Sequence, residues 1–232
     1  MHANGLKRGV QDLKCTTNNM RVWDCTWPAP LGVSPGTVKD ICIKDRFHSC
    51  HPLETTNVKI PALSPGDHEV TINYLNGFQS KFTLNEKDVS LIPETPEILD
   101  LSADFFTSSL LLKWNDRGSA LPHPSNATWE IKVLQNPRTE PVALVLLNTM
   151  LSGKDTVQHW NWTSDLPLQC ATHSVSIRWH IDSPHFSGYK EWSDWSPLKN
   201  ISWIRNTETN VFPQDKVVLA GSNMTICCMS PT

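Results

Sequence analysis

The sequence lacks two features that several functional classes require, a long hydrophobic run and an excess of charge of one sign. Its 232 residues include 20 lysines and arginines against 23 aspartates and glutamates. Binding to nucleic-acid phosphates needs a clustered basic surface, so this balance argues against a nucleic-acid partner. The longest apolar run, Val142–Leu147, is far shorter than the roughly 20 residues that cross a bilayer. We therefore expect no membrane insertion by this chain.

Signatures of common enzyme classes are also scarce. The chain contains no His-Glu-x-x-His and no glycine loop of the kind that cradles phosphate, and its nine histidines are scattered. Hydrolysis would need a Ser-His-Asp constellation, paired carboxylates or zinc ligands, and the residue spacing indicates none of these. We predict a protein that is not an enzyme and that holds no metal and no cofactor.

Glycosylation sequons and cysteines, in contrast, are frequent. Asn-x-Ser/Thr occurs at Asn126, Asn161, Asn200 and Asn223. One such tripeptide arises easily by chance, but four of them beside seven cysteines favour the secretory pathway. The first residues, 1–5, lack the apolar core of a secretory signal. We expect an extracellular protein, either secreted or part of a cell-surface ectodomain, that is glycosylated at these asparagines.

The first four cysteines form a group near the N-terminus. Their order suggests two hairpin disulfides, Cys15–Cys25 and Cys42–Cys50, although four cysteines allow three connectivities. Each short-loop disulfide would contribute about 2–4 kcal/mol to a small fold. Metal binding is the alternative, because His48 and His51 flank the last of these cysteines. No Cys-x-x-Cys or histidine pair at zinc-ligand spacing accompanies them, so disulfides are the preferred interpretation.

The last three cysteines leave two interpretations open. Cys227 and Cys228 are adjacent, so in a strand their side chains point to opposite faces. Cys170 has no partner in its own segment. Either Cys170 forms a long-range disulfide with Cys227, which would tie its module to the segment that follows, or it is a free thiol.

Apolar and polar residues alternate through much of the chain, and no long stretch repeats at the helical period. The clearest alternating segments are 69–74, 110–114, 129–133 and 174–181. A period of two gives each strand one buried and one solvent-facing side. The sequence therefore predicts an all-β fold.

A joint with two prolines, Pro93-Glu94-Thr95-Pro96, separates two series of strands. Proline fixes its own φ and biases the preceding residue towards extended geometry, so the joint is stiff. This predicts an N-terminal tail over 1–13, a first module over 14–94 and a second module over 95–205. Residues 206–232 contain two strand-like segments, which are too few for a sandwich, so we expect an incomplete domain there.

The segment Trp192-Ser193-Asp194-Trp195-Ser196 is a Trp-Ser-x-Trp-Ser motif. Such a segment is poor material for a core strand, but exposed indoles stack well on guanidinium and ammonium groups. Strand alternation places Arg178 and Lys132 on solvent-facing sides. If their strands neighbour the motif, rings and cations form a ladder in which each exposed contact contributes about 0.5–1 kcal/mol. We expect this ladder to stabilise the fold rather than to contact a ligand.

Two motifs together resemble a known family. The Trp-Ser-x-Trp-Ser motif near the end of a second module is similar to the signature of class I cytokine receptors. Cys15, Cys25 and Trp27 match that family's Cys-x9-Cys-x-Trp motif in a first module. The two motifs in this order, on either side of a two-proline joint, are highly specific, and the resemblance covers residues 14–204.

The resemblance implies tandem fibronectin type III-like sandwiches followed by the start of an immunoglobulin-like domain. It implies that Cys15–Cys25 and Cys42–Cys50 are the disulfides of the first module. It also implies that Trp192, Trp195 and Arg178 form the centre of the ladder. The family often places a tyrosine at a turn where this sequence has His68 and His173, so those turns are expected to differ locally.

In functional terms the resemblance implies an extracellular fragment that binds a four-helix cytokine of the interleukin-6 family and does not signal by itself. It also implies a shared signalling subunit of that family as a further partner. In this family, loops at the elbow between the modules grip the cytokine. The corresponding loops here are 64–68, 76–79, 116–123 and 183–190.

Within these loops the expected contact residues are Phe78, His185, Phe186 and Tyr189, because aromatic side chains dominate binding hot spots. The other interpretation of these four is that they are ordinary solvent-facing turn residues. A different functional class is also to be weighed, because fibronectin-type sandwiches serve in cell adhesion and matrix binding. The two motifs argue against such a module without cytokine specificity.

Overall fold

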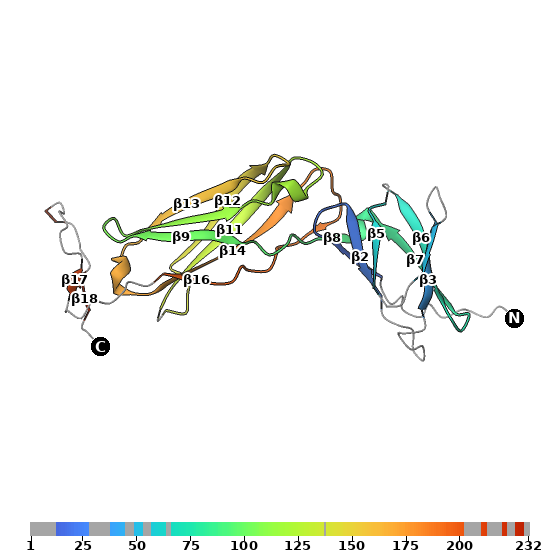
Figure 1. Ribbon diagram of the computed structural model, residues 1–232, viewed down its shortest axis with the longest axis horizontal. Helices are drawn as coiled ribbons and strands as arrows, with labels where there is room; N and C mark the ends of the chain where they lie inside the picture. Colours follow the sequence, from blue (N-terminus) through green and yellow to red (C-terminus); the bar gives the residue numbers. More distant parts are fainter. Residues whose placement is uncertain are drawn as a thin grey trace. The chain divides into compact units, whose positions relative to one another are not determined.

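A computed structural model of the chain describes residues 13–27, 38–44, 49–52, 57–63, 66–136, 138–201, 210–212, 220–221 and 226–229. Within these ranges the regular structure consists of β-strands and short 3-10 helices, without an α-helix. The chain divides into two compact units (Figure 1). Unit 1 comprises residues 1–93 and 183–191, and unit 2 comprises residues 94–182 and 192–232.

Unit 1 is built from a five-stranded and a four-stranded sheet. The first sheet has the order β15-β8-β1-β2-β5, formed by Tyr189–Lys190, Val89–Leu91, Lys14–Thr17, Val22–Thr26 and Asn57–Pro61. The second has the order β4-β3-β6-β7, formed by Ser49–Pro52, Val38–Lys44, Asp67–Tyr74 and Gln79–Asn85. A 3-10 helix, η2 (Glu86–Asp88), leads into β8. Residues 183–191, which the sequence places in the second module, thus supply an edge strand to unit 1.

Unit 2 is built from a three-stranded and a four-stranded sheet. The first has the order β13-β10-β9, formed by Val157–Thr163, Ser109–Asn115 and Ile98–Asp104. The second has the order β12-β11-β14-β16, formed by Ala143–Leu151, Ser125–Gln135, His173–Asp182 and Lys199–Ile201. Two 3-10 helices, η3 (Gly118–Ala120) and η4 (Leu168–Cys170), lie in its loops. Further along the chain, β17 (Asn210–Phe212) pairs antiparallel with β18 (Cys227–Met229).

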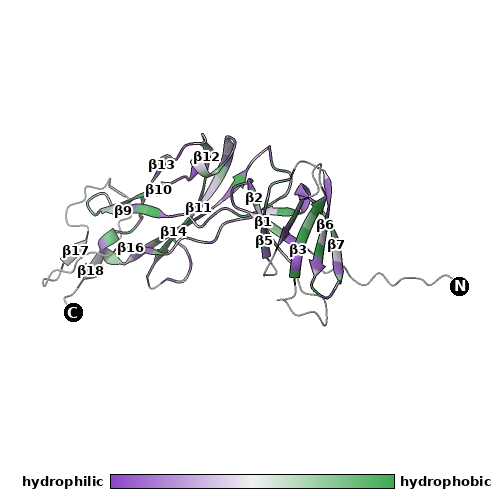
Figure 2. Cartoon of the chain, turned by 45° about the vertical axis from the view of Figure 1, so that its right-hand side comes forward, coloured by the Kyte–Doolittle hydropathy of each residue, from purple (hydrophilic) through white to green (hydrophobic). Residues whose placement is uncertain are grey.

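The predicted period of two is visible in the burial of the strands. In β11 every second side chain from Ser125 to Gln135 is buried, and β6 alternates in the same way. Hydrophobic and hydrophilic residues follow one another along strands such as β3 and β6 (Figure 2). Because each sheet buries one face, two sheets must pack together to form a core. The predicted all-β fold, with two sandwiches in tandem along the chain, is confirmed.

Three tryptophans occupy the core of unit 2. Trp129 and Trp179 stack with ring centroids 4.8 Å apart, and Trp114 lies tilted against Trp129 at 5.4 Å. All three are at most 2% exposed. The indole nitrogen of Trp179 donates to the carbonyl oxygen of Glu94 over 2.8 Å, so the core is also attached to the start of the unit. Buried aromatic groups of this size dominate the energetics of a small core.

A buried carboxylate fixes one end of unit 2. Asp116 is fully buried and accepts hydrogen bonds from the backbone nitrogens of Gly118 at 3.0 Å and Thr156 at 2.9 Å. The hydroxyl of Thr156 and the side-chain amide of Gln158, at 3.1 Å, donate to the same carboxylate. Full satisfaction of its oxygens explains why a carboxylate is tolerated here, and it assigns the residue a structural role.

Candidate functional site

The Trp-Ser-x-Trp-Ser segment lies along β14 and is held there by its two serines. Ser193 donates its backbone N–H to the carbonyl oxygen of Trp179 over 2.8 Å, and its hydroxyl accepts from the N–H of Trp179 at 3.1 Å. Ser196 repeats this arrangement with Ile177, at 2.8 and 3.0 Å. Both serines are 4% exposed. Each serine therefore makes, with one residue of β14, the two hydrogen bonds that a neighbouring strand would otherwise make.

The tryptophans of the segment carry a ladder of rings and cations on the outer face. The Lys132 ammonium lies 4.1 Å from the ring centroid of Trp195. The guanidinium carbon of Arg178 lies 4.6 Å from Trp195 and 4.8 Å from Trp192. His180 meets Trp192 edge-on at 4.5 Å. The order along the ladder is thus Lys132, Trp195, Arg178, Trp192 and His180.

An ion pair anchors the central cation. Arg178 donates from Nε to Oε2 of Glu130 at 2.5 Å, and the two residues are direct partners between β14 and β11. The Glu130 side chain is 12% exposed, so removal of its partner would leave a mostly buried carboxylate uncompensated. Glu130 and His180 were not among the residues predicted from the sequence to form this ladder. Both lie on the same face of their strands as the predicted cations, which is the signal that identifies them.

Saturated contacts leave the ladder little capacity for a ligand. Its cations are already engaged by two rings and one carboxylate, and its serines by the backbone of β14. The remaining residue of the motif, Asp194, is exposed. These contacts support a structural role for the motif.

The disulfides of unit 1 lie between directly opposed residues. Cys15 and Cys25 are bonded across β1 and β2, and Cys42 and Cys50 are bonded across β3 and β4. The sulfur atoms of Cys42 and Cys50 also lie close to Asp40, but disulfide sulfurs are not thiolate ligands for a metal ion. Cys170 is disulfide-bonded, which excludes a free thiol. The side chains of Cys227 and Cys228, one of which was its predicted partner, lie outside the described residues.

Three of the four predicted glycosylation sites are accessible. Asn126, Asn161 and Asn200 are exposed, on β11, β13 and β16 respectively. The hydroxyl of Ser174 donates to the side-chain oxygen of Asn200 at 2.7 Å and leaves its nitrogen available. Asn223 lies outside the described residues.

The two histidines at the expected tyrosine turns are both buried. His173 is fully buried, and its Nδ1 lies 3.0 Å from the carbonyl oxygen of Ala171. Burial lowers the pKa of His173 below its usual value, because the charged imidazolium loses its hydration. His68 is 5% exposed in β6. His68 lies in β6 and His173 begins β14, so an imidazole occupies each position where a tyrosine was expected.

The predicted ligand contacts differ in accessibility. Tyr189 is 65% exposed and Phe78 is 49% exposed, while His185 also lies at the surface. Phe186 is only 4% exposed, which corrects the expectation of surface exposure for this residue. The Cζ atom of its ring lies 2.7 Å from the position that a Cβ atom on Gly188 would take. Phe186 is therefore a packing residue, whereas Tyr189, Phe78 and His185 are exposed.

The segment 183–191 that carries Tyr189 is fixed to unit 1 by backbone contacts. Tyr189 and Lys190 form β15 parallel to β8, and the N–H of Glu191 donates to the carbonyl oxygen of Leu91 at 3.0 Å. Gly188 approaches β8 so closely that a Cβ atom at this position would overlap the carbonyl oxygen of Val89. Only glycine permits this approach. The exposed Tyr189 ring is thereby presented from an ordered strand rather than from a loose loop.

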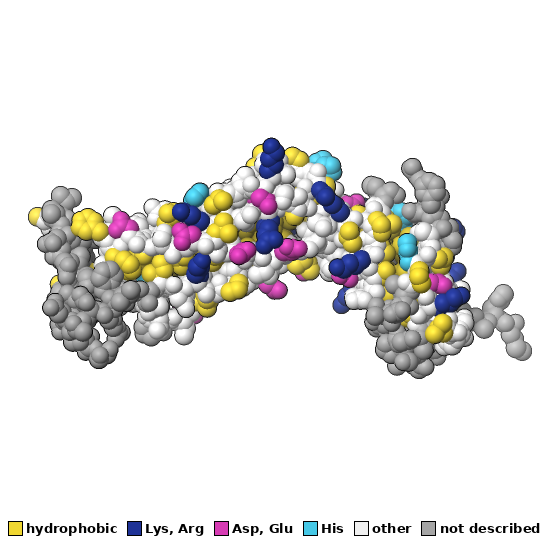
Figure 3. All heavy atoms as spheres, viewed as in Figure 1, with side chains coloured by type: hydrophobic (Ala, Val, Ile, Leu, Met, Phe, Trp, Pro, Cys, Tyr) yellow, Lys and Arg dark blue, Asp and Glu magenta, His cyan; other side chains and the backbone are white. Residues whose placement is uncertain are grey.

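A hollow of about 660 Å³ lies beside Tyr189 in unit 1. Phe82 and Tyr189 supply its aromatic lining, and Lys14, Asp88 and Glu191 supply charged groups. Its volume is within the roughly 300–1,000 Å³ typical of ligand recesses. On the face of the described residues seen in Figure 3, basic and acidic side chains are interspersed rather than gathered by sign. A partner of mixed polarity suits this surface better than a polyanion.

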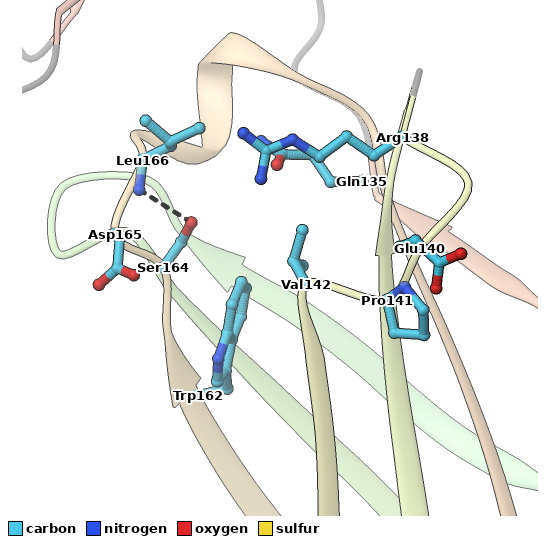
Figure 4. A pocket seen from close by; sticks show the side chains of 9 residues that line it. All are labelled: Gln135, Arg138, Glu140, Pro141, Val142, Trp162, Ser164, Asp165 and Leu166. Atoms are coloured by element: carbon cyan, nitrogen blue, oxygen red, sulfur yellow. Dashed lines mark hydrogen bonds between the residues drawn. The ribbon is translucent and has the colours of Figure 1, made fainter.

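A smaller hollow of about 280 Å³ lies at one end of unit 2 (Figure 4). Trp162 and Val142 point into it, with Gln135 and Arg138 opposite Leu166. This volume is below the roughly 300–1,000 Å³ of typical small-molecule sites. Ser164 and Asp165 also line it, whereas neither histidine nor cysteine does.

None of the described residues belongs to a helix with the length and hydropathy that crossing a bilayer would require.

Comparison with known proteins gives matches along the whole chain. Three family profiles match: the leukemia inhibitory factor receptor N-terminal domain at residues 11–86, its D2 domain at 88–201 and its Ig-like domain at 211–232. The leukemia inhibitory factor receptor of Rattus norvegicus is 88% identical over 100% of this chain. That of Homo sapiens is 62% identical over 98%. The chain spans 21% of the length of each of these receptors.

More distant similarities extend to other receptors. The oncostatin-M-specific receptor subunit beta of Homo sapiens is 32% identical over 60% of this chain, which corresponds to 14% of that protein. Among solved structures, a cytokine receptor complex aligns over 82% of this chain and 96% of its own, with a TM-score of 0.48 and 12% identity.

Proposed function

The chain belongs to the leukemia inhibitory factor receptor family, and on that premise we propose that it binds a four-helix cytokine such as leukemia inhibitory factor. It is an extracellular receptor fragment. A shared signalling subunit of the interleukin-6 family would be its further partner in the whole receptor. The observation that carries the proposal is the exposed ring of Tyr189, held by a β-strand beside a hollow of about 660 Å³.

The chemistry of this surface suits a protein ligand. Tyr189 and Phe78 expose aromatic area in unit 1, and tyrosine supplies large contact area at low entropic cost. Lys14, Asp88 and Glu191 border the hollow with charges of both signs, which favours a polar rim around an aromatic centre. His185 is exposed in the same segment as Tyr189, residues 183–191. We assign cytokine contact to Tyr189, Phe78 and His185.

The proposal includes the absence of catalysis. A Gly-x-Ser-x-Gly string does occur at Gly32–Gly36, a spacing found at the nucleophile of many hydrolases. That motif requires a helix directly after the serine turn, whereas β3 begins at Val38. No histidine lines either of the two hollows described above, and Cys15, which lines the larger one, is disulfide-bonded to Cys25. These observations support a binding function without chemistry, in keeping with a cytokine receptor family.

We also propose module boundaries that follow the two-proline joint. Residues 14–94 form the first module and 95–205 the second, with 183–191 attached to the first by its β15 contacts. Residues 206–232 are the beginning of an immunoglobulin-like domain, in line with the profile match at 211–232.

Direct binding tests the proposed function. The secreted, disulfide-bonded chain is immobilised, and leukemia inhibitory factor is passed over it beside an unrelated four-helix cytokine as control. Saturable binding of the first and none of the second is the expected result. Equal binding of both, or binding of neither by a monomeric and correctly bonded sample, would remove cytokine recognition from these modules. Adhesion to matrix proteins would then be the function to test.

A further inference from the structure

Strand β12 forms an open edge of unit 2. It pairs with β11 over nine residues, from Ser125↔Leu151 to Val133↔Ala143, without a register shift. In the sheet order β12-β11-β14-β16 it is terminal, and among the described residues no strand pairs with its other side (Figure 1). Alternate N–H and C=O groups of an edge strand point away from its neighbour. A regular nine-residue edge is therefore a template for another strand.

The sequence of β12, residues 143–151, contains no charged residue, no proline and no glycine. Its outward side chains are exposed: Leu144 by 57%, Leu146 by 62% and Met150 by 74%. Charged side chains, prolines and β-bulges are the usual devices that protect an edge from pairing. β12 has none of them, and it displays three large apolar side chains to solvent.

Six of the seven other edge strands of the two described sandwiches carry such a device. The protecting residues are Lys190 in β15, Lys59 and Pro61 in β5, Pro52 in β4, Lys81 in β7, Asp100 and Asp104 in β9, and Lys199 in β16. The seventh, β13, has no such residue but carries the predicted glycosylation site Asn161, so β12 is the edge strand with neither. The contrast within one chain indicates that β12 is left open for pairing rather than unprotected by a general feature of the fold.

Two charged residues of β11 lie beside the exposed leucines of β12. Glu130 and Lys132 lie next to Leu146 and Leu144 in the register, on the same face. Glu130 is paired with Arg178, and the Lys132 ammonium lies over the Trp195 ring. Glu130 is neutralised by its ion pair, whereas Lys132 keeps its charge and is directed onto the Trp195 ring. The strip of Leu144, Leu146 and Met150 is itself uncharged, and an apolar, uncharged strand suits this edge.

A second copy of β12 is such a strand. An antiparallel pairing with a two-fold axis at Leu147 gives overlap of all nine residues. The axis sets Leu144 opposite Met150 of the second copy, so apolar residues face apolar residues, and it sets Leu146 opposite Asn148. An isologous contact of this kind is self-complementary and closed, and it produces a dimer rather than a fibre.

We propose that the chain self-associates through β12, and that two copies join their four-stranded sheets into one continuous sheet across this edge. Asn126 is the direct partner of Met150 and projects from the outer face of the sheet, beside the edge rather than along it. A glycan on Asn126 therefore borders the dimer contact at both ends without occupying the edge.

Sedimentation of the whole glycosylated chain over a range of concentrations tests this proposal. The wild-type chain is expected to show a reversible monomer–dimer equilibrium. Leu146→Lys places two like charges close to the two-fold axis and is expected to weaken the dimer by about tenfold or more. Leu99→Lys introduces the same charge at a 45% exposed leucine of β9 and is the matched control, expected to dimerise like wild type. A wild-type chain that stays monomeric, or a dimer that Leu146→Lys leaves intact, overturns the proposal.

Cysteine pairing tests the register independently of stability. In a mixture of Leu146→Cys and Asn148→Cys chains, the two-fold axis at Leu147 brings the new thiols opposite each other. A mixed disulfide between the two variants is expected to form faster than one between Leu144→Cys and Asn148→Cys, which are not opposed. Equal rates for the two mixtures would contradict the β12 register. Circular dichroism of each variant verifies that the fold is retained.

Discussion

Gly188 lies against Val89 so tightly that a side chain on Gly188 would overlap the Val89 carbonyl oxygen and lie 2.6 Å from that of Glu86. The contact brings residues 183–191 onto β8 and thereby orders Tyr189. These two carbonyl groups belong to the backbone, so they cannot move aside as the end of a flexible side chain could. The presentation of the candidate binding residue thus depends on the absence of a single methyl group.

Gly188→Ala is expected to loosen this segment. The added methyl group must displace β15 from β8, at a cost of about 1–3 kcal/mol as for other overpacked sites. Hydrogen exchange should show lost protection at Tyr189 and Lys190, with a lower Tm for unit 1. Ser187→Ala, at the preceding position, removes only an exposed hydrogen bond of 3.3 Å to the Glu86 carboxylate, so as the control it should have a much smaller effect on both. Unaltered exchange in Gly188→Ala would show that the segment is not held by this contact.

Arg178→Ala is expected to destabilise unit 2 by about 2–4 kcal/mol, because it removes two ring contacts and leaves the mostly buried Glu130 without its ion pair. Urea unfolding measures this loss. Arg178→Lys keeps the charge but not the planar stacking, so it should recover only part of the stability.

A double-mutant cycle separates the two contributions of Arg178. Glu130→Gln alone and in combination with Arg178→Ala should show coupling, because the pair lies 2.5 Å apart. Lys132→Ala removes one exposed contact and should cost only about 0.5–1 kcal/mol. Additivity of the Glu130 and Arg178 changes would contradict a central role for this ion pair.

Ser193→Ala and Ser196→Ala are each expected to cost about 1–3 kcal/mol, because each leaves a buried N–H of β14 without its acceptor. Asp194→Ala, at the exposed middle position of the same motif, is the matched control and should be nearly neutral. Thermal unfolding of the three variants provides the comparison. Equal effects at all three positions would refute the hydrogen-bonding role of the serines.

Acid is expected to destabilise unit 2 through His173. Burial holds the pKa of His173 below the ordinary value of 6.5, so the unfolded chain binds its proton at a higher pH than the folded chain. The stability from neutral His173 is therefore complete above pH 6.5 and falls as the pH drops from there towards the folded-state pKa. Urea unfolding at several pH values measures this slope.

His173→Gln should flatten that pH dependence, since glutamine does not titrate. His159→Gln is the control, because His159 is exposed on β13 and should leave the slope unchanged. A slope that persists in His173→Gln would assign the acid sensitivity to another group.

Strand periodicity predicted much of this molecule. The alternation around Ile131 and Ile177 identified buried faces, and by the same count it placed Lys132 and Arg178 on the outer face. The Trp-Ser-x-Trp-Ser motif then indicated what those cations contact. These inferences succeed because a period of two is a property of the strand itself and needs no tertiary information.

The burial and pairing of loop residues could not be predicted from strand periodicity. The loop that contains Phe186 has no period, so its sequence does not separate the buried Phe186 from the exposed Tyr189. The pairing of β15 with β8 joins residues about a hundred positions apart, and short strands of two residues have no pattern to recognise. The close approach at Gly188 follows from that pairing, and it becomes visible only in three dimensions.

Binding of leukemia inhibitory factor to a matched pair of variants tests directly whether Tyr189 contacts the cytokine. Tyr189→Ala removes the exposed ring beside the hollow of unit 1, and Phe106→Ala removes an 86% exposed ring from unit 2 as the control. We expect Tyr189→Ala to weaken binding by about tenfold or more, as for an aromatic hot spot, and Phe106→Ala to bind like wild type. Binding by Tyr189→Ala at wild-type affinity would contradict the assignment of this surface to the cytokine.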